Sequence, residues 1–232
     1  SAKVFASAYR MMKMDLCDAV LVGGIDSLCL NTLYGFSSLE LVSKKPCAPF
    51  AIDRTGISIG EAAAYALLEW PKSVQDHSGV AFLGYGESSD AYHMSTPHPD
   101  GTGAMLAMQR ALACAALKPQ QIAYVNAHGT ATLVNDAMED KAINKVFGSD
   151  TPCSSTKGWT GHTLGAAGIT EAIISILCIQ KNFIPGTLNT VAVDPSFKSQ
   201  ILLNNESRPV EYALTNSFGF GGSNCSLIFG AV

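Results

Sequence analysis

The sequence predicts a layered α/β fold in which helices cover buried sheets. From residue 79 onward, short apolar runs alternate with helical patterns, which is typical of a strand and helix repeat. The segment 161–181 is apolar on nearly every side, so we expect a helix buried between sheets. A chain of 232 residues with 47% hydrophobic and 15% charged residues can bury such a core.

The first third of the chain predicts a helix and two strands. Residues 2–12 repeat apolar side chains at helical spacing from the start, so the chain is expected to enter a helix whose first turn is missing and to be a fragment or a processed chain, with no signal peptide. Residues 18–24 end in Gly-Gly and predict a short buried parallel strand. We expect loop and short helix over 31–60. Residues 61–70 predict a strand, although their alanines also permit a helix.

The polar, proline-containing segment 71–78 is the predicted boundary between two parts, residues 1–75 and residues 76–232. The second part is expected to contain a strand at 80–86, a helix at 101–117, a strand at 122–126, a helix at 135–147, a strand at 151–155, the apolar helix at 161–181, and strands near 200–205 and 223–229.

Composition narrows the function classes. A net charge of -4 and a pI near 5.7 give no broad basic field, so nucleic-acid binding is not expected. The seven cysteines contain no C-x-x-C pair, which favours a reducing compartment and a cytoplasmic location. The longest nearly apolar stretch, 165–179, is interrupted by Glu171 and is shorter than the roughly 18 to 20 residues that span a bilayer, so no membrane segment is expected.

Three segments combine reactive polar groups with the ends of apolar runs. They read N-A-H-G-T-A-T at 126–132, S-T-K-G-W-T-G-H at 155–162 and N-S-F-G-F-G-G at 216–222. In α/β folds, ligand and catalytic groups converge where strands end. We therefore expect the three segments to meet at one site.

The order of these motifs resembles the β-ketoacyl synthases of the elongating, two-histidine kind, and the resemblance covers essentially the whole chain. It implies a thiolase-like, layered αβαβα fold with mixed sheets and a buried central helix. Residues 1–75 would then be the remainder of an incomplete N-terminal half and residues 76–232 the C-terminal half. The implied reaction is the decarboxylative Claisen condensation of an acyl thioester with malonyl carrier protein, which gives a 3-oxoacyl carrier protein in fatty acid, polyketide or related synthesis.

The resemblance also implies what lies outside the chain. The nucleophilic cysteine is expected about three residues before Ser1, so this chain alone is expected to be inactive. The implied partners are an acyl carrier protein, malonyl and acyl thioesters carried on phosphopantetheine, and a second copy in a homodimer. No cofactor, metal, nucleic acid or membrane is expected.

The resemblance assigns catalytic roles to four residues. His128 and His162 would be paired N–H donors that stabilise the enolate formed on decarboxylation. Because His162 follows Thr160, a plausible N-cap, we predict that it lies in the first turn of the helix at 161–181, where the dipole opposes protonation. Glu171 is expected about two and a half turns beyond His162 on the same helix. The resemblance pairs it with Lys157, and together they would hold His162 in place.

Other positions match supporting roles in the family. Thr130 and Thr132 would contact the pantetheine arm. Phe220 would complete the acyl oxyanion hole with its backbone N–H and gate the acyl pocket with its ring. The remaining supporting positions are Asp136, Glu139, Phe218 and Gly221.

Several alternatives remain open at this point. Lys44, Lys45 and Arg54 either offer a basic patch to an acidic carrier protein or form a solvated charge cluster. The whole protein could instead be a non-catalytic partner of the same fold, such as a chain-length-determining subunit. A zinc hydrolase is disfavoured because His128 and His162 lack a third ligand at suitable spacing.

Overall fold

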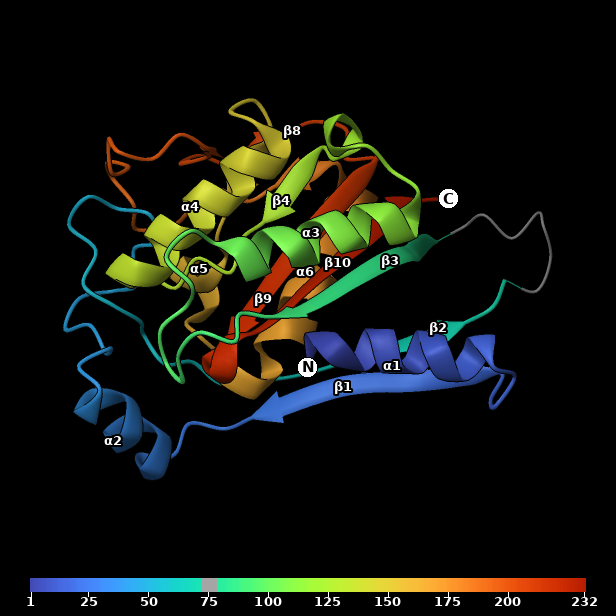
Figure 1. Cartoon of the computed structure of the whole chain (residues 1–232), viewed down its shortest axis with the longest axis horizontal. Helices are drawn as coiled ribbons and strands as arrows, with labels where there is room; N and C mark the ends of the chain where they lie inside the picture. The colour runs from blue at the N-terminus through green and yellow to red at the C-terminus, as the bar shows by residue number, and fades with distance from the viewer. Residues whose placement is uncertain (72–78) are drawn as a thin grey trace.

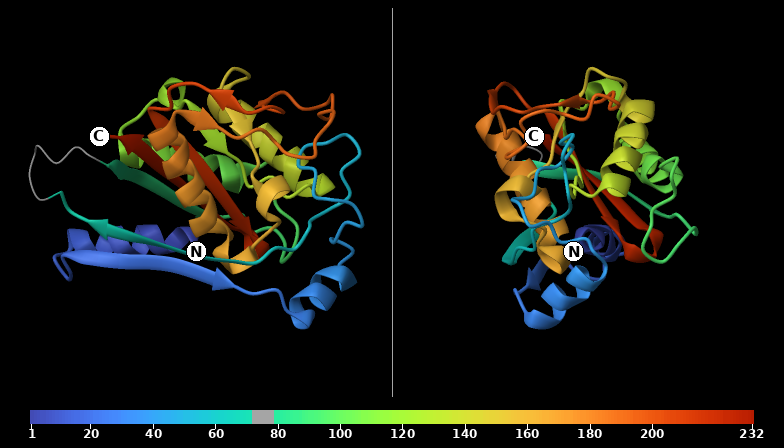
Figure 2. Two further views of the ribbon diagram at one scale, coloured as in Figure 1. Left: turned by 180° about the vertical axis from the view of Figure 1, so that it is seen from behind. Right: turned by 90° about the vertical axis from the view of Figure 1, so that its left-hand side faces the viewer.

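The computed structural model describes residues 1–71 and 79–232, which form four layers in the order helix, sheet, helix, sheet (Figure 1). Helices α3 (Thr102–Ala115) and α4 (Leu133–Phe147) cover one face of a six-stranded sheet. Helices α1 (Ala2–Lys13) and α6 (Ala167–Lys181) pack on its other face, and a two-stranded sheet lies beyond them (Figure 2). The expected layered α/β architecture, with mixed sheets and a buried central helix, is confirmed.

The six-stranded sheet is mixed and buried on both faces. Its order is β3-β10-β9-β4-β5-β7, in which β9, β4, β5 and β7 are parallel and β10 is antiparallel to both β9 and β3. Successive residues alternate between faces, so Tyr124 packs toward α6 while Val125 packs toward α3 and α4. The bounds are β3 (Val80–Ser89), β4 (Tyr124–Asn126), β5 (Pro152–Ser154), β7 (Gln200–Ile201), β9 (Tyr212–Gly219) and β10 (Ser223–Ala231).

Helix α3 packs closely on β3 because Gly86 has no side chain, and a Cβ there would lie 1.9 Å from the carbonyl oxygen of Ala107.

The remaining elements complete the fold. The other elements are β1 (Ala19–Asp26), α2 (Leu30–Ser38), β2 (Ala62–Glu69), η1 (Pro119–Gln121), α5 (Lys157–Thr160), η2 (Leu164–Ala166), β6 (Phe183–Ile184), β8 (Glu206–Ser207) and η3 (Phe220–Gly222).

Two strand predictions need correction. Residues 18–24 do form a strand, but β1 runs antiparallel to β2 and is not buried, since Leu21 and Ile25 remain 67% and 63% exposed. Only one face of this two-stranded sheet is covered, so alternate side chains point outward. Strand β9 was not predicted as a strand because polar residues interrupt its apolar run. The predicted boundary at 71–78 falls largely on residues outside the described ranges, and the division at residue 75 stays a prediction.

The central helix begins later than predicted. Gly161 has a φ of +69° and ends the short helix α5, and α6 starts only at Ala167 after the turn η2. Within the described ranges, Leu164–Lys181 is a helical stretch of 18 residues that is long and apolar enough to cross a membrane, and half of it is buried inside the fold. The apolar stretch is therefore longer than the sequence indicated. In this structure it packs between the two sheets, as a core helix does.

Candidate active site

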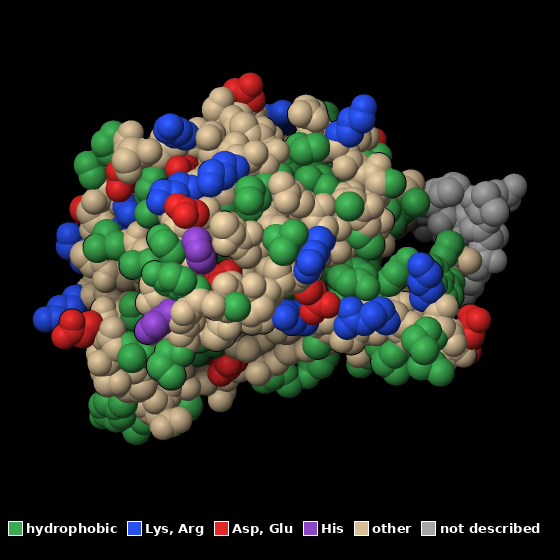
Figure 3. Space-filling view, viewed as in Figure 1, with side chains coloured by type: hydrophobic (Ala, Val, Ile, Leu, Met, Phe, Trp, Pro, Cys, Tyr) green, Lys and Arg blue, Asp and Glu red, His purple; other side chains and the backbone are tan. Residues whose placement is uncertain are grey.

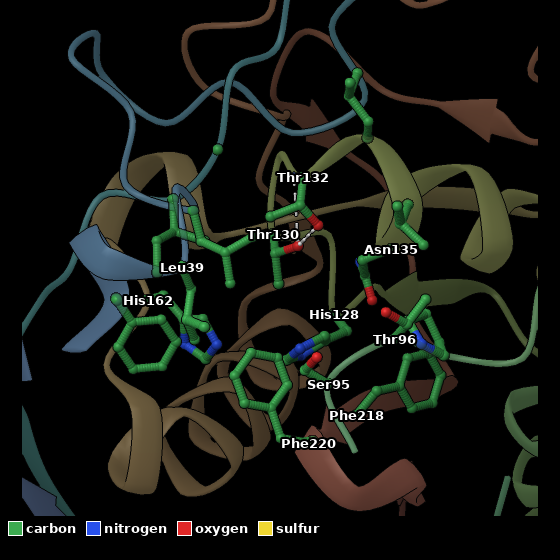
Figure 4. A pocket seen from close by; sticks show the side chains of 18 of the residues that line it. Leu39, Ser95, Thr96, His128, Thr130, Thr132, Asn135, His162, Phe218 and Phe220 are labelled. Atoms are coloured by element: carbon green, nitrogen blue, oxygen red, sulfur yellow. Dashed lines mark hydrogen bonds between the residues drawn. The ribbon is translucent and has the colours of Figure 1, made fainter. Parts of the chain in front are cut away.

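The three predicted segments meet at a cavity of about 840 Å³ beside the carboxyl ends of β4 and β9. Figure 4 shows the side chains that line it. Of the predicted site residues, six line the cavity, namely His128, Thr130, Thr132, His162, Phe218 and Phe220. The charged residues Asp136, Lys157 and Glu171 lie behind this lining and are buried. The cavity therefore has a lining of histidine, threonine and apolar side chains, supported by buried charges.

His128 is held by its backbone. The main-chain N–H groups of His128 and Gly129 donate to the two carboxylate oxygens of Glu139, at 2.8 and 2.7 Å. Gly129 has a φ of +36°, and a side chain there would collide with Ser155. Ser155 in turn donates to the Gly129 carbonyl oxygen at 2.7 Å. Sequence motifs placed Glu139 near the site, but its contact with the His128 backbone was not predicted.

Lys157 determines which nitrogen of the His128 ring carries the proton. Its ammonium group contacts three acceptors, which are the carboxylate of Glu171, the carbonyl oxygen of His128 and, at 3.2 Å, Nδ1 of His128. An ammonium group has three N–H donors and no lone pair, so Nδ1 must be the acceptor. The proton of the neutral ring is thereby assigned to Nε2.

The predicted ion pair between Lys157 and Glu171 is confirmed. The prediction that this pair holds His162 in place is wrong, because Lys157 contacts the His128 ring instead. Glu171 lies in the second turn of α6, whereas His162 lies before that helix, so the two do not share one helix as predicted. Burial raises the pKa of Glu171, and the charge of Lys157 opposes that shift.

His162 lies in an extended segment, and its predicted place in a helical turn is wrong. Its N–H donates to the carbonyl oxygen of Ser58 at 2.7 Å, and its carbonyl oxygen accepts from Gly60 at 3.0 Å. The N–H of Leu164 donates to Nδ1 of His162 at 3.2 Å. Leu164 has a φ of +48°, an uncommon conformation for leucine that turns its N–H toward the ring. Nδ1 is again the acceptor, which leaves the proton on Nε2.

Both imidazoles are kept neutral. Burial lowers the pKa of His162 to about 3, with a further contribution from Lys157. Burial also lowers the pKa of His128 well below its ordinary value, and Lys157 and His162 add to the shift. The low pKa expected for His162 is thus found, but its cause is burial and a nearby cation and not a helix dipole. The ring centroids lie 5.4 Å apart, and the Phe218 ring lies 5.6 Å from His128.

Arg54 lines the cavity, and the buried Asp136 lies behind it. The carboxylate of Asp136 accepts from the N–H of Phe50 at 2.7 Å and from that of Ala131 at 3.2 Å. The Arg54 guanidinium lies 3.8 Å from Asp136 and 2.9 Å from Asp194, and its side chain is buried. Arg54 is therefore not part of a surface basic patch. Arg54 is near Lys44 and Lys45 in the sequence, which suggested one surface patch. The sequence alone does not show that Arg54 is buried against carboxylates.

The remaining predicted residues are two threonines and the turn after β9, and of these Thr130, Thr132 and Phe220 line the cavity. The hydroxyl groups of Thr130 and Thr132 lie 2.9 Å apart, and Thr132 is the N-cap residue of α4. The Phe220 ring is half exposed and stacks on Phe36 with centroids 5.9 Å apart. Gly221 does not line the cavity, but its N–H donates to the carbonyl oxygen of Met94 at 2.6 Å, and this joins the turn after β9 to the loop after β3.

The chain is similar to one family in both of its parts. The description "Beta-ketoacyl synthase, N-terminal domain" matches residues 1–72, and "Beta-ketoacyl synthase, C-terminal domain" matches residues 80–191. The mitochondrial 3-oxoacyl-[acyl-carrier-protein] synthase of Arabidopsis thaliana is 40% identical and is matched over 100% of this chain and 54% of its own length. The chain therefore spans about half the length of this curated relative.

Solved structures show the same likeness. A ketosynthase in complex with its chain length factor from Xenorhabdus doucetiae superimposes with a TM-score of 0.93 at 45% identity, over 100% of this chain and 58% of that one. A type II polyketide acyl-carrier protein in complex with its ketosynthase gives a TM-score of 0.93 at 28% identity, over 100% and 60% of the two chains.

Proposed function

Because this chain belongs to the β-ketoacyl synthase family, we propose that the whole protein joins an acyl thioester to the carbanion released from a malonyl thioester. The product is a 3-oxoacyl thioester two carbons longer, and carbon dioxide leaves. The observation that carries the proposal is the pair of neutral rings at the cavity, each with its Nδ1 occupied as an acceptor. Both Nε2–H groups are then available as donors.

The proposed chemistry of this chain is the decarboxylation step. The malonyl thioester oxygen accepts hydrogen bonds from Nε2 of His128 and Nε2 of His162. As the C–C bond to the carboxylate breaks, its electron pair moves toward the thioester, and negative charge gathers on that oxygen. Donors fixed in a water-poor site stabilise this charge at little reorganisation cost. Neutral rings suit this role because they donate a proton in a hydrogen bond without protonating the carbanion.

The acyl half of the reaction needs a thiolate that the family resemblance puts upstream of Ser1. That thiolate takes the acyl group from a carrier thioester, and the enolate carbon then attacks the acyl carbonyl carbon and releases the thiolate. The Phe220 backbone N–H would stabilise the acyl oxyanion, and Thr130 and Thr132 would contact the pantetheine arm. Substrates arrive on phosphopantetheine, so the proposal requires no further cofactor. We also propose that the protein is cytoplasmic and pairs with a second copy of itself in a homodimer.

The second candidate is a non-catalytic subunit of the chain-length-factor kind. The Xenorhabdus doucetiae ketosynthase is described with its chain length factor, so both kinds of chain occur in one complex there. The neutral histidine pair and its ion-pair support favour the enzyme for this chain. The residue at the nucleophile position separates the two, since a cysteine supports the enzyme and a glutamine supports the partner.

The function is tested with the full-length protein, an acyl carrier thioester and malonyl carrier protein. We expect mass spectrometry to show an acyl group lengthened by two carbons and bearing a 3-oxo group, with one carbon dioxide released per product. Omission of the acyl donor should leave slow carbon dioxide release alone. Carbon dioxide release no faster than in the absence of protein would remove the proposal.

A further inference from the structure

Asp26 ends strand β1 and contacts the turn that follows His162. Its carboxylate oxygen Oδ2 accepts from the N–H of Gly165 at 2.8 Å. Gly165 directly follows Leu164, whose own N–H donates to Nδ1 of His162 at 3.2 Å. A side chain of the two-stranded sheet is therefore bound one residue away from the contact that determines which nitrogen of His162 carries the proton.

The turn η2 has free N–H groups for such contacts. The first N–H groups of a helical turn have no partner within the turn itself. Here the N–H of Leu164 donates to a ring nitrogen and the N–H of Gly165 donates to a carboxylate, whereas Ala166 donates to the carbonyl oxygen of Thr163 at 2.9 Å. Asp26 thus binds this turn as a capping residue would, although it lies 139 residues earlier in the chain.

The backbone of Leu164 requires support from both sides. Its φ of +48° is one that leucine rarely adopts, so contacts around the turn must hold it. On one side, the main chain of His162 pairs with residues 58–60. On the other side, Asp26 holds Gly165. If the turn relaxed toward an ordinary φ, the N–H of Leu164 would move away from Nδ1 of His162.

Asp26 is not part of a charge cluster. Within the part of the chain that the structure describes, its carboxylate forms no ion pair. Its sequence neighbours Ile25, Leu28 and Leu30 are exposed apolar residues. Figure 3 shows hydrophobic side chains gathered over α2 in the lower left of the view, and α2 begins at Leu30. The carboxylate therefore acts through its hydrogen bond to the turn and not through a cation.

We propose that Asp26 is a positioning residue for His162. It holds the turn at Gly165, the turn keeps the N–H of Leu164 on Nδ1 of the ring, and the ring proton stays on Nε2. The hydrogen bond that one ring nitrogen makes decides which nitrogen carries the proton, and partners behind a reactive ring fix its orientation. The inference rests on the proposed function, because it names a residue that acts through one of the two donors of that reaction.

The test removes the acceptor in the full-length protein. In the variant Asp26→Ala, kcat for decarboxylation of malonyl-pantetheine should fall about tenfold, while KM should change less than about twofold. Nitrogen-15 NMR should show part of the His162 population with its proton on Nδ1. His128 is an internal reference in the same spectrum, because Lys157 and not the turn determines its proton position.

Two further variants separate the hydrogen bond from the charge and from folding. Asp26→Asn keeps an acceptor oxygen without the charge, so it should restore kcat to within about threefold of wild type and the His162 proton to Nε2. The matched control is Gln121→Ala. The side-chain oxygen of Gln121 accepts from the N–H of Lys118 at 2.9 Å in the turn η1, which does not line the cavity. The control loses the same kind of contact and should match wild type in both measurements.

The outcomes separate the role of Asp26 from the reaction itself. An Asp26→Ala variant whose His162 proton stays on Nε2 would overturn the inference, whatever its kcat, and would leave the proposed function standing. An equal change at both rings would show a general loss of structure and would also overturn it, as would an Asp26→Asn variant as impaired as Asp26→Ala. A wild-type protein that releases no carbon dioxide from malonyl-pantetheine would instead remove the function, and the NMR spectra would still test Asp26.

Discussion

Replacement of His128 by alanine is expected to slow the decarboxylation of malonyl-pantetheine by about 100-fold to 1,000-fold, because one of two fixed donors to the developing enolate is lost. The backbone contacts of His128 with Glu139 and Lys157 do not depend on the ring, so the variant should fold. Release of carbon dioxide by the full-length protein is the measurement.

A matched control is His93→Ala. His93 lies in an exposed loop, where its ring accepts from the N–H groups of Ser95 and Thr96. It has no part in the proposed chemistry, and its loss should leave carbon dioxide release within about twofold of wild type. A His128→Ala variant as active as this control would contradict the role of the ring.

Replacement of Lys157 by methionine is expected to lower the free energy of unfolding by about 3 to 5 kcal/mol, because it leaves the Glu171 carboxylate buried without its cation. Lys157 and Glu171 are 1% and 2% exposed, so water cannot take the place of the missing partner. Urea unfolding of the full-length protein measures the loss. Lys118→Met, at an exposed site, is the matched control and should change stability by less than about 0.5 kcal/mol.

The same variant should also affect catalysis through His128. Without the ammonium group, nothing fixes Nδ1 as an acceptor, so part of the population adopts the other tautomer. We expect kcat for decarboxylation to fall while KM for malonyl-pantetheine changes little. The double variant Lys157→Met with Glu171→Gln should recover part of the stability but not the lost kcat. A double variant that regains full activity would show that the ion pair has only a structural role.

The sequence was sufficient for the elements with clear periodicity and for the motifs that meet at the cavity. The helices at 101–117 and 135–147 appear as α3 and α4 within a few residues. Motif order brought His128 and His162 to one site because the ends of parallel strands share one edge of a sheet. These features depend on local pattern and on topology, which a sequence records.

Features that depend on long-range contacts could not be predicted in the same way. Thr160 resembled an N-cap, yet it is the last residue of α5. Gly161 ends that helix, and His162 then pairs with the segment 58–60, so the central helix α6 begins only at Ala167. The partner of Lys157 was predicted correctly, but the ring that it contacts was not. Arg54 was placed on the surface because its partners, Asp136 and Asp194, are far away in the sequence.

The most direct test of the account is the protonation state of the two active-site histidines. Nitrogen-15 NMR of the full-length protein reports the proton position on each ring. We predict that His128 and His162 are both neutral with the proton on Nε2 from about pH 8 down to about pH 5, since a lowered pKa keeps a ring neutral at every pH above it. A ring that titrates near its ordinary pKa of about 6.5, or that carries its proton on Nδ1, would contradict the proposed pair of donors.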